Sequence, residues 1–148
     1  MVTIDKIKQL REETGISIAE CKKALVESKG DLESAKKILK ERGKEFASKK
    51  GEREVGQGVI ASYIHQNKKV GVLLDLRCET DFVARSQEFQ NLAHELCLQI
   101  AAIDPKETPL SEQSWIKDQS KAIKDLIEEY IAKTGENIII KKFEKYQI

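Results

Sequence analysis

The sequence has few of the residue types that usually perform chemistry, and no stretch that resembles a membrane segment. Its 148 residues include two histidines, three cysteines, one tryptophan and two prolines, and aromatic residues make up 5%. No apolar run approaches the roughly 20 residues that a membrane helix needs. The N-terminal segment lacks the apolar core of a signal peptide. We therefore expect a cytoplasmic protein with no membrane partner.

The cysteines and histidines form no recognisable site. Cys21, Cys78 and Cys97 are odd in number and show neither a CxxC pair nor the spacing of zinc ligands. Each falls on an apolar face, which predicts buried, reduced thiols. His65 and His94 are predicted to lie on the surface. Because no catalytic arrangement and no glycine-rich phosphate loop is present, we expect no enzyme, no metal or cofactor, and no GTP site in this chain.

Positive charge is not in excess. The chain has 26 Lys and Arg against 25 Asp and Glu, which gives a net charge of +1. Binding to a phosphate backbone draws on clustered basic residues, so this balance predicts no direct contact with nucleic acid. The alternative is a small RNA-associated protein that uses Lys141, Lys142 and Lys145 on the last predicted strand.

Helical spacing of apolar residues predicts three short helices in residues 1–43. The expected N-caps are Thr3, Ser17 and Asp31, and the expected ends are Gly15, Gly30 and Gly43. The expected inward-facing residues are Ile4, Ile7, Leu10, Cys21, Ala24, Leu25, Leu32, Ala35, Ile38 and Leu39. Residues 44–54 are polar with interspersed charges of both signs, which predicts a solvated linker whose first residues can extend the preceding helix as a frayed end.

From Val55 the apolar period changes from that of a helix to that of a strand. Two strands are predicted around a turn at residues 66–69, and in the second strand Val70, Val72, Leu74, Leu76 and Cys78 all fall on one face. Helices are predicted after Ser86 and again up to Gly135, joined by a connection over 105–117, with a third strand at 137–146. The fold class is therefore α+β: a three-helix domain (1–43), a linker (44–54), and a domain (55–148) with a small antiparallel three-stranded sheet packed with helices.

The hexapeptide Thr80-Asp81-Phe82-Val83-Ala84-Arg85 lies at the corner between the second strand and the next helix. Two interpretations fit it locally. In one, Asp81 caps a short turn of helix, for which Thr80 is the other candidate cap, and Phe82 is a core residue. In the other, an aromatic ring beside a carboxylate projects from the corner and inserts into a partner protein.

A family resemblance favours the second interpretation. The string SYIHQNKKVGVLLDLRCETDFVAR (62–85) resembles elongation factor Ts, the nucleotide exchange factor of elongation factor Tu. So do the N-terminal pattern RxxTGxxxxxCKKALxxxxGDxxxAxxxLxxxG (11–43) and Gly-Glu-Asn-Ile near the end of the chain. The resemblance implies a ubiquitin-associated-type fold for residues 1–43.

The resemblance also implies a function and a site. Elongation factor Tu would be the partner, and the site would be Thr80, Asp81, Phe82 and Val83. Asp81 and Phe82 would act as a wedge that displaces the support of the Mg²⁺ ion in elongation factor Tu. Val83 and Ala84 would pack the corner, and Arg85 would pair with an acidic neighbour. The N-terminal helices would be a second, weaker contact with the GTPase.

The chain departs from the family in one region, which bears on its oligomeric state. Most members carry a long insertion in the region that is only a short loop between Asp104 and Ser111 here. In the longest members of the family this insertion includes a second copy of the core subdomain, of which this chain has one. A chain with one core subdomain is expected to pair with itself as a two-fold homodimer, which restores the missing half, although a monomer is also compatible with the sequence. The alternative function is that of a non-exchanging adaptor that binds proteins through its N-terminal helices.

Overall fold

The computed structural model describes residues 1–148 and begins with three helices: α1 (Ile4–Thr14), α2 (Ile18–Glu27) and α3 (Leu32–Lys50). The predicted caps are confirmed, since the side chains of Thr3, Ser17 and Asp31 each accept a backbone N–H from the first turn of their helix. A core of six buried residues joins the helices: Leu10, Cys21, Ala24, Leu25, Ala35 and Leu39. Ile4, predicted to face inward, is instead 71% exposed.

Helix α3 does not end at Gly43, so that prediction is wrong. It continues to Lys50, and residues 44–50, expected to belong to a linker, form its last turns. Phe46 and Ala47 pack against the second core of the molecule, and Gly43 lies against Ala132. This tertiary packing outweighs the cost of a glycine inside a helix, which is about 1 kcal/mol. Only the short segment between Gly51 and Gly56 then connects α3 to the sheet.

The sheet has three antiparallel strands in the order β1 (Gln57–Ile64), β2 (Val70–Cys78) and β5 (Ile139–Gln147). The predicted alternation of β2 is confirmed, because Val72, Leu74, Leu76 and Cys78 are buried on one face. A side chain at Gly58 would meet the backbone carbonyl of Leu76 at 2.1 Å, so this position of β1 requires glycine.

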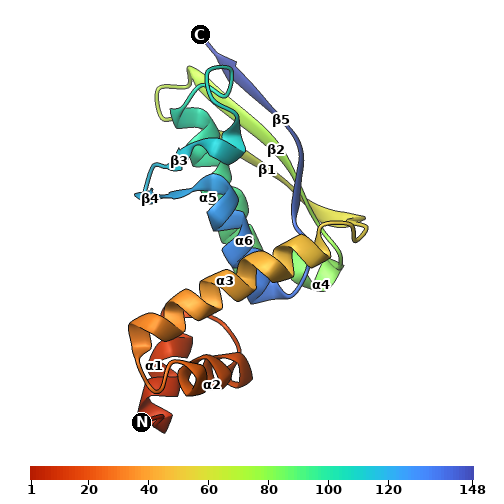
Figure 1. Ribbon diagram of the computed structural model, residues 1–148. Helices are drawn as coiled ribbons and strands as arrows, with labels where there is room; N and C mark the ends of the chain where they lie inside the picture. The colour runs from red at the N-terminus through yellow and green to blue at the C-terminus, as the bar shows by residue number, and fades with distance from the viewer.

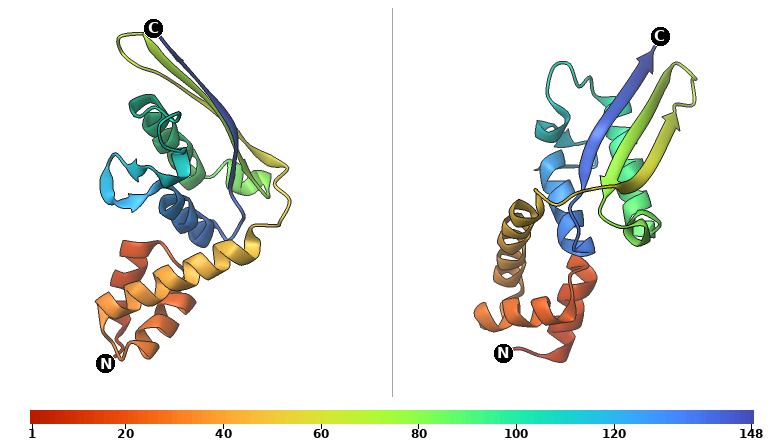
Figure 2. Two further views of the ribbon diagram at one scale, coloured as in Figure 1. Left: turned by 45° about the horizontal axis from the view of Figure 1, so that its top comes forward. Right: turned by 90° about the vertical axis from the view of Figure 1, so that its right-hand side faces the viewer.

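Helices α5 (Gln87–Ala102) and α6 (Ile123–Thr134) lie on one side of the sheet, whose other side is uncovered (Figure 1; Figure 2, left). The buried core between sheet and helices includes Phe89, Leu92, Leu96 and Ile100 of α5. All three thiols are buried and free, as predicted. Burial raises the pKa of both Cys78 and Cys97 to about 11, so they are protonated at neutral pH. None of the helices combines the length and the apolar character needed to cross a membrane.

The segment predicted as a plain connection over 105–117 contains more structure than expected, and residues 118–122, predicted as the start of the last helix, form a strand instead. A 3₁₀ turn, η1 (Leu110–Glu112), leads into a small hairpin of β3 (Ser114–Trp115) and β4 (Asp118–Ala122). Gln99 of α5 organises it, since its amide donates to Gln113 Oε1 and to the Ser114 carbonyl, each at 3.0 Å. Its Oε1 accepts the N–H of Ile116 at 2.9 Å. Gln99 is fully buried, although its neighbours in sequence gave no sign of this role.

Candidate functional site

The corner after β2 forms the short helix α4 (Asp81–Ala84), and it presents one aromatic ring to solvent. Thr80 caps the helix, because its Oγ1 accepts the N–H of Val83 at 3.2 Å. Phe82 is 86% exposed. The interpretation with Asp81 as the cap and Phe82 in the core is therefore wrong on both counts. A lone exposed apolar side chain is common on protein surfaces, so the significance of Phe82 depends on how firmly its corner is held.

The two residues after Phe82 anchor the corner to the core of the protein. Val83 is 7% exposed and Ala84 is 1% exposed, and both belong to the large core. Of the four predicted contact residues, Val83 therefore offers the least surface to a partner. The predicted acidic neighbour of Arg85 is Asp81, whose Oδ2 lies 2.8 Å from Nε. This pair is exposed and contributes little to stability, but it sets charged groups beside the Phe82 ring.

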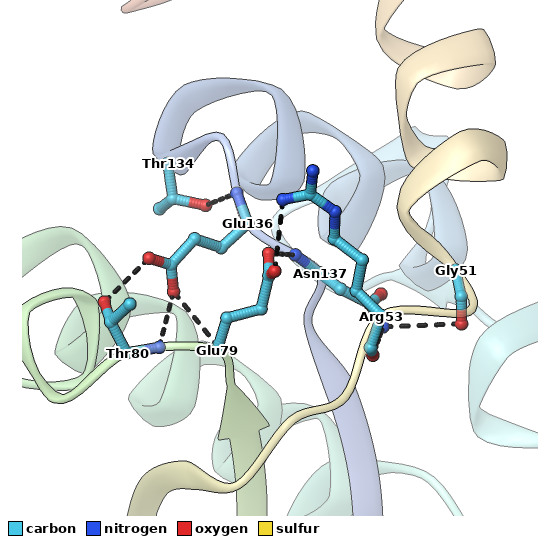
Figure 3. Close-up of polar contacts among 7 residues, drawn as sticks. All are labelled: Gly51, Arg53, Glu79, Thr80, Thr134, Glu136 and Asn137. Atoms are coloured by element: carbon cyan, nitrogen blue, oxygen red, sulfur yellow. Dashed lines mark hydrogen bonds and ion pairs between the residues drawn. The ribbon is translucent and has the colours of Figure 1, made fainter.

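The carboxylate of Glu136, which is distant in sequence, bonds to the residues at the start of the corner (Figure 3). Glu136 Oε1 accepts the backbone N–H groups of Glu79 and Thr80, at 3.1 and 2.9 Å. The other oxygen, Oε2, accepts the Thr80 hydroxyl at 2.7 Å. Three donors thus converge on one side chain, and hydrogen bonds to an ionised acceptor are stronger than those between neutral groups.

Glu79, in turn, bonds from the corner to the residue that follows Glu136. Its Oε2 accepts the backbone N–H of Asn137 at 2.8 Å, and its Oε1 lies 3.3 Å from a guanidinium nitrogen of Arg53. Asn137 is 2% exposed, and its amide donates to the carbonyls of Arg53 and Gly51, at 2.9 and 3.4 Å. The corner is consequently bonded to the segment that follows α3 (Figure 3).

The other candidate residues lie outside this site. His65 and His94 are exposed, and both lie near Tyr63, whose hydroxyl is 2.8 Å from His65 Nδ1. No group of three or more His, Cys, Asp or Glu side chains is arranged to hold a metal ion.

The lysines of the RNA-binding alternative do not gather on one face of the sheet. Lys142 pairs with Asp75 and Lys145 pairs with Val72 of β2. Positions three apart on a strand point to opposite faces. Lys141 falls at an irregularity in the ladder between β2 and β5. β5 therefore presents no continuous basic stripe.

The sequence predicts the tip of this candidate site, but it does not predict the residues that support the tip. Glu79 and Glu136 are 57 residues apart, and only the fold brings them together. The family string Gly-Glu-Asn-Ile at 135–138 does not by itself indicate a structural role. The available signal was that the left-handed Gly135 ends α6 and leaves Glu136 and Asn137 in a short link to β5. In that link the Glu136 side chain bonds to the corner and the Asn137 side chain bonds to the segment after α3.

Comparison with known proteins gives a consistent result. Residues 79–148 match the family model described as Elongation factor TS. The chain is 40% identical to elongation factor Ts of Thermotoga neapolitana, in an alignment that covers 99% of this chain and 97% of that protein. It is 37% identical to elongation factor Ts of Thermosipho melanesiensis, over 100% and 99% of the two chains. These alignments span 191 and 194 positions, so the relatives contain residues without a counterpart among the 148 here.

Proposed function

The chain belongs to the elongation factor Ts family, a family of translation elongation factors, and we propose that it promotes release of GDP from elongation factor Tu. The observation that supports this most directly is the exposed Phe82 on a corner held by Val83, Ala84 and Glu136. A ring fixed in this way loses little conformational freedom when a partner covers it, so more of its burial energy remains for binding.

Phe82 and Asp81 supply the chemistry that the proposal needs. Burying a phenylalanine side chain contributes about 1.5–3 kcal/mol, and aromatic anchors are frequent interface hot spots. A GTPase holds its nucleotide through a phosphate loop and Mg²⁺. A ring inserted beside the Mg²⁺ site would move the residues that support the metal. Asp81, which is paired with Arg85, would contact polar groups of elongation factor Tu around the inserted ring.

Exchange then follows from thermodynamic linkage and requires no covalent step. If this protein binds nucleotide-free elongation factor Tu more tightly than the GDP form, then by reciprocity it weakens GDP binding by the same factor. Phe82 would be covered fully only in the nucleotide-free complex. The N-terminal helices would contribute affinity for both forms, and therefore no release by themselves.

The test is release of a fluorescent GDP from elongation factor Tu, followed by stopped flow across a range of concentrations of this protein. We expect the release rate to rise with concentration and to saturate. A complex that forms without faster release would contradict the exchange role and would support the adaptor function instead.

The uncovered side of the sheet bears on the expected homodimer. Four large apolar or aromatic side chains of its outer face are more than half exposed, namely Ile60 at 63%, Ile64 at 64%, Leu73 at 51% and Tyr146 at 76%. The first three lie on the adjacent strands β1 and β2, whose ladder pairs Ile60 with Asp75 and Ile64 with Gly71, and Tyr146 of β5 pairs with Gly71 from the other side. An apolar patch of this kind favours association, and a two-fold pairing would cover it on both copies.

We expect the free protein to self-associate reversibly at micromolar or higher concentration, and Leu73→Lys to abolish this association. A lysine at Leu73 would place a charge in the apolar patch of both copies, and burying an unpaired charge is unfavourable. Ile116→Lys is the matched control, because Ile116 is 39% exposed and lies on the β3–β4 hairpin, away from this face. Sedimentation velocity over a concentration series measures the result. A wild-type protein that stays monomeric at hundreds of micromolar would contradict the homodimer.

A further inference from the structure

Helix α4, which presents Phe82, cannot hold its own position. It has four residues, and isolated helices much longer than this are unstable in water. The position of the ring therefore depends on contacts from outside the helix. Val83 and Ala84 fix α4 against the core. The direction in which the chain enters the helix from β2 depends on the contacts of Glu79 and Thr80, one of which is the Cys78 thiol that donates to the Thr80 carbonyl at 3.2 Å.

Glu136 fixes that entry. The residues between β2 and α4 are Glu79 and Thr80, and the backbone N–H groups of both donate to Glu136 Oε1. The Thr80 hydroxyl bonds in two directions, since it donates to Glu136 Oε2 and accepts the N–H of Val83. Glu136 is thus connected through one residue to the first turn of α4, which contains Phe82.

The surroundings of Glu136 indicate why this contact is stable. The Glu79 carboxylate lies in the same small network, and two like charges in proximity are unfavourable. Glu79, however, accepts the N–H of Asn137 and pairs with Arg53, while Glu136 accepts three donors (Figure 3). Each of the two carboxylates therefore has its own set of hydrogen-bond donors. Glu136 is half-buried and points along the corner, so it orients Phe82 without lying at the exposed tip.

We propose that Glu136 is a positioning residue for nucleotide exchange, which acts by fixing the start of α4 and thereby the direction of the Phe82 ring. The inference rests on the proposed function, because it assigns to Glu136 a role in exchange through Phe82. It predicts that loss of the carboxylate slows the release step while the protein still binds elongation factor Tu.

The first experiment compares Glu136→Ala, Glu136→Gln and the control Glu128→Ala in GDP release. Glu128 is a half-buried residue of α6 that makes no side-chain hydrogen bond or ion pair. For Glu136→Ala we expect the saturating rate to fall roughly fivefold or more, with a half-saturating concentration close to that of wild type. Glu136→Gln keeps an oxygen that can accept both backbone N–H groups and should retain most of the rate. Circular dichroism checks folding, and Glu136→Asp replaces Glu136→Ala if the latter unfolds.

The second experiment distinguishes positioning from a general structural role. In a Phe82→Ala background, Glu136→Ala should cause no further fall in the saturating rate, because both substitutions remove the same interaction. A further fall as large as in the wild-type background would overturn the proposal, and so would an unchanged rate for a folded Glu136→Ala protein. A raised half-saturating concentration with an unchanged saturating rate would also overturn it, because Glu136 would then be a direct contact.

Hydrogen exchange on the free protein separates failure of this inference from failure of the proposed function. The amides of Glu79 and Thr80 should exchange faster in Glu136→Ala than in wild type, and unchanged exchange would contradict the positioning geometry. If wild type does not accelerate GDP release at all, the exchange function is wrong whatever the amides show. If wild type and Phe82→Ala behave as proposed and Glu136→Ala matches wild type, the positioning role alone is wrong.

Discussion

Replacing Phe82 with alanine is expected to lower the saturating rate of GDP release from elongation factor Tu at least tenfold and to leave the protein fully folded. A tenfold change corresponds to about 1.4 kcal/mol of lost transition-state stabilisation, less than many aromatic hot spots contribute. Stability should not change, because the ring is 86% exposed and packs against no core residue in the free protein. Stopped-flow release measures the first effect and thermal unfolding the second.

Tyr146→Ala is the matched control for this experiment. Tyr146 is 76% exposed and lies near the C-terminus, at the end of the sheet away from α4 (Figure 1). Its loss should leave the release rate unchanged. If the folded Phe82→Ala protein releases GDP as fast as wild type, the ring is not the wedge. If both variants are equally slow, the effect of Phe82 is not specific to the corner.

The regular elements of the fold could be predicted because local patterns determine them. The period-two spacing of the apolar residues Val72, Leu74, Leu76 and Cys78 in β2 and the helical spacing of α5 each reflect one face that packs against the core. The N-caps of the first three helices were found for a similar reason, since a cap depends only on residues within one turn. The elements predicted well are those whose physical cause lies within a few residues.

The predictions that failed depend on contacts distant in sequence. Gly43 ends no helix because Phe46 and Ala47 find a second core to pack against, which local propensity cannot indicate. The β3–β4 hairpin has no alternating pattern, and it is stabilised by the buried side chain of Gln99, which belongs to helix α5. The sequence did not determine whether Phe82 is buried, for the same reason. The burial of a ring at a corner depends on whether residues distant in sequence pack over it.

The continuity of α3 changes how the two predicted contacts with the partner would cooperate. A flexible linker would raise the local concentration of the second contact over a range of orientations. Helix α3 instead runs from the small core to the large one, and Gly51 at its end bonds to Asn137 beside the corner (Figure 1). The N-terminal helices and Phe82 are therefore presented in one fixed relation. Such preorganisation lowers the entropic cost of forming both contacts.

Leu25→Asp tests the contribution of the N-terminal helices, and we expect it to weaken binding strongly while the saturating release rate is retained. Deleting residues 1–43 would cut α3 in the middle, so a point substitution is the cleaner choice. Leu25 is fully buried in the six-residue core, and an unpaired carboxylate there should unfold α1 and α2. The large core and the Phe82 corner contain none of the residues of that small core.

Gln9→Asp, at an exposed position of α1, introduces the same side chain without disturbing the core. For Leu25→Asp, amide spectra should keep the signals of residues 55–148 and lose those of α1 and α2. The half-saturating concentration for GDP release should rise roughly tenfold or more, while Gln9→Asp should match wild type. Equal half-saturating concentrations for wild type and Leu25→Asp would show that the N-terminal helices are not a second contact. A lower saturating rate in Leu25→Asp alone would instead mean that the small core helps to position Phe82, through α3 and the bond between Gly51 and Asn137.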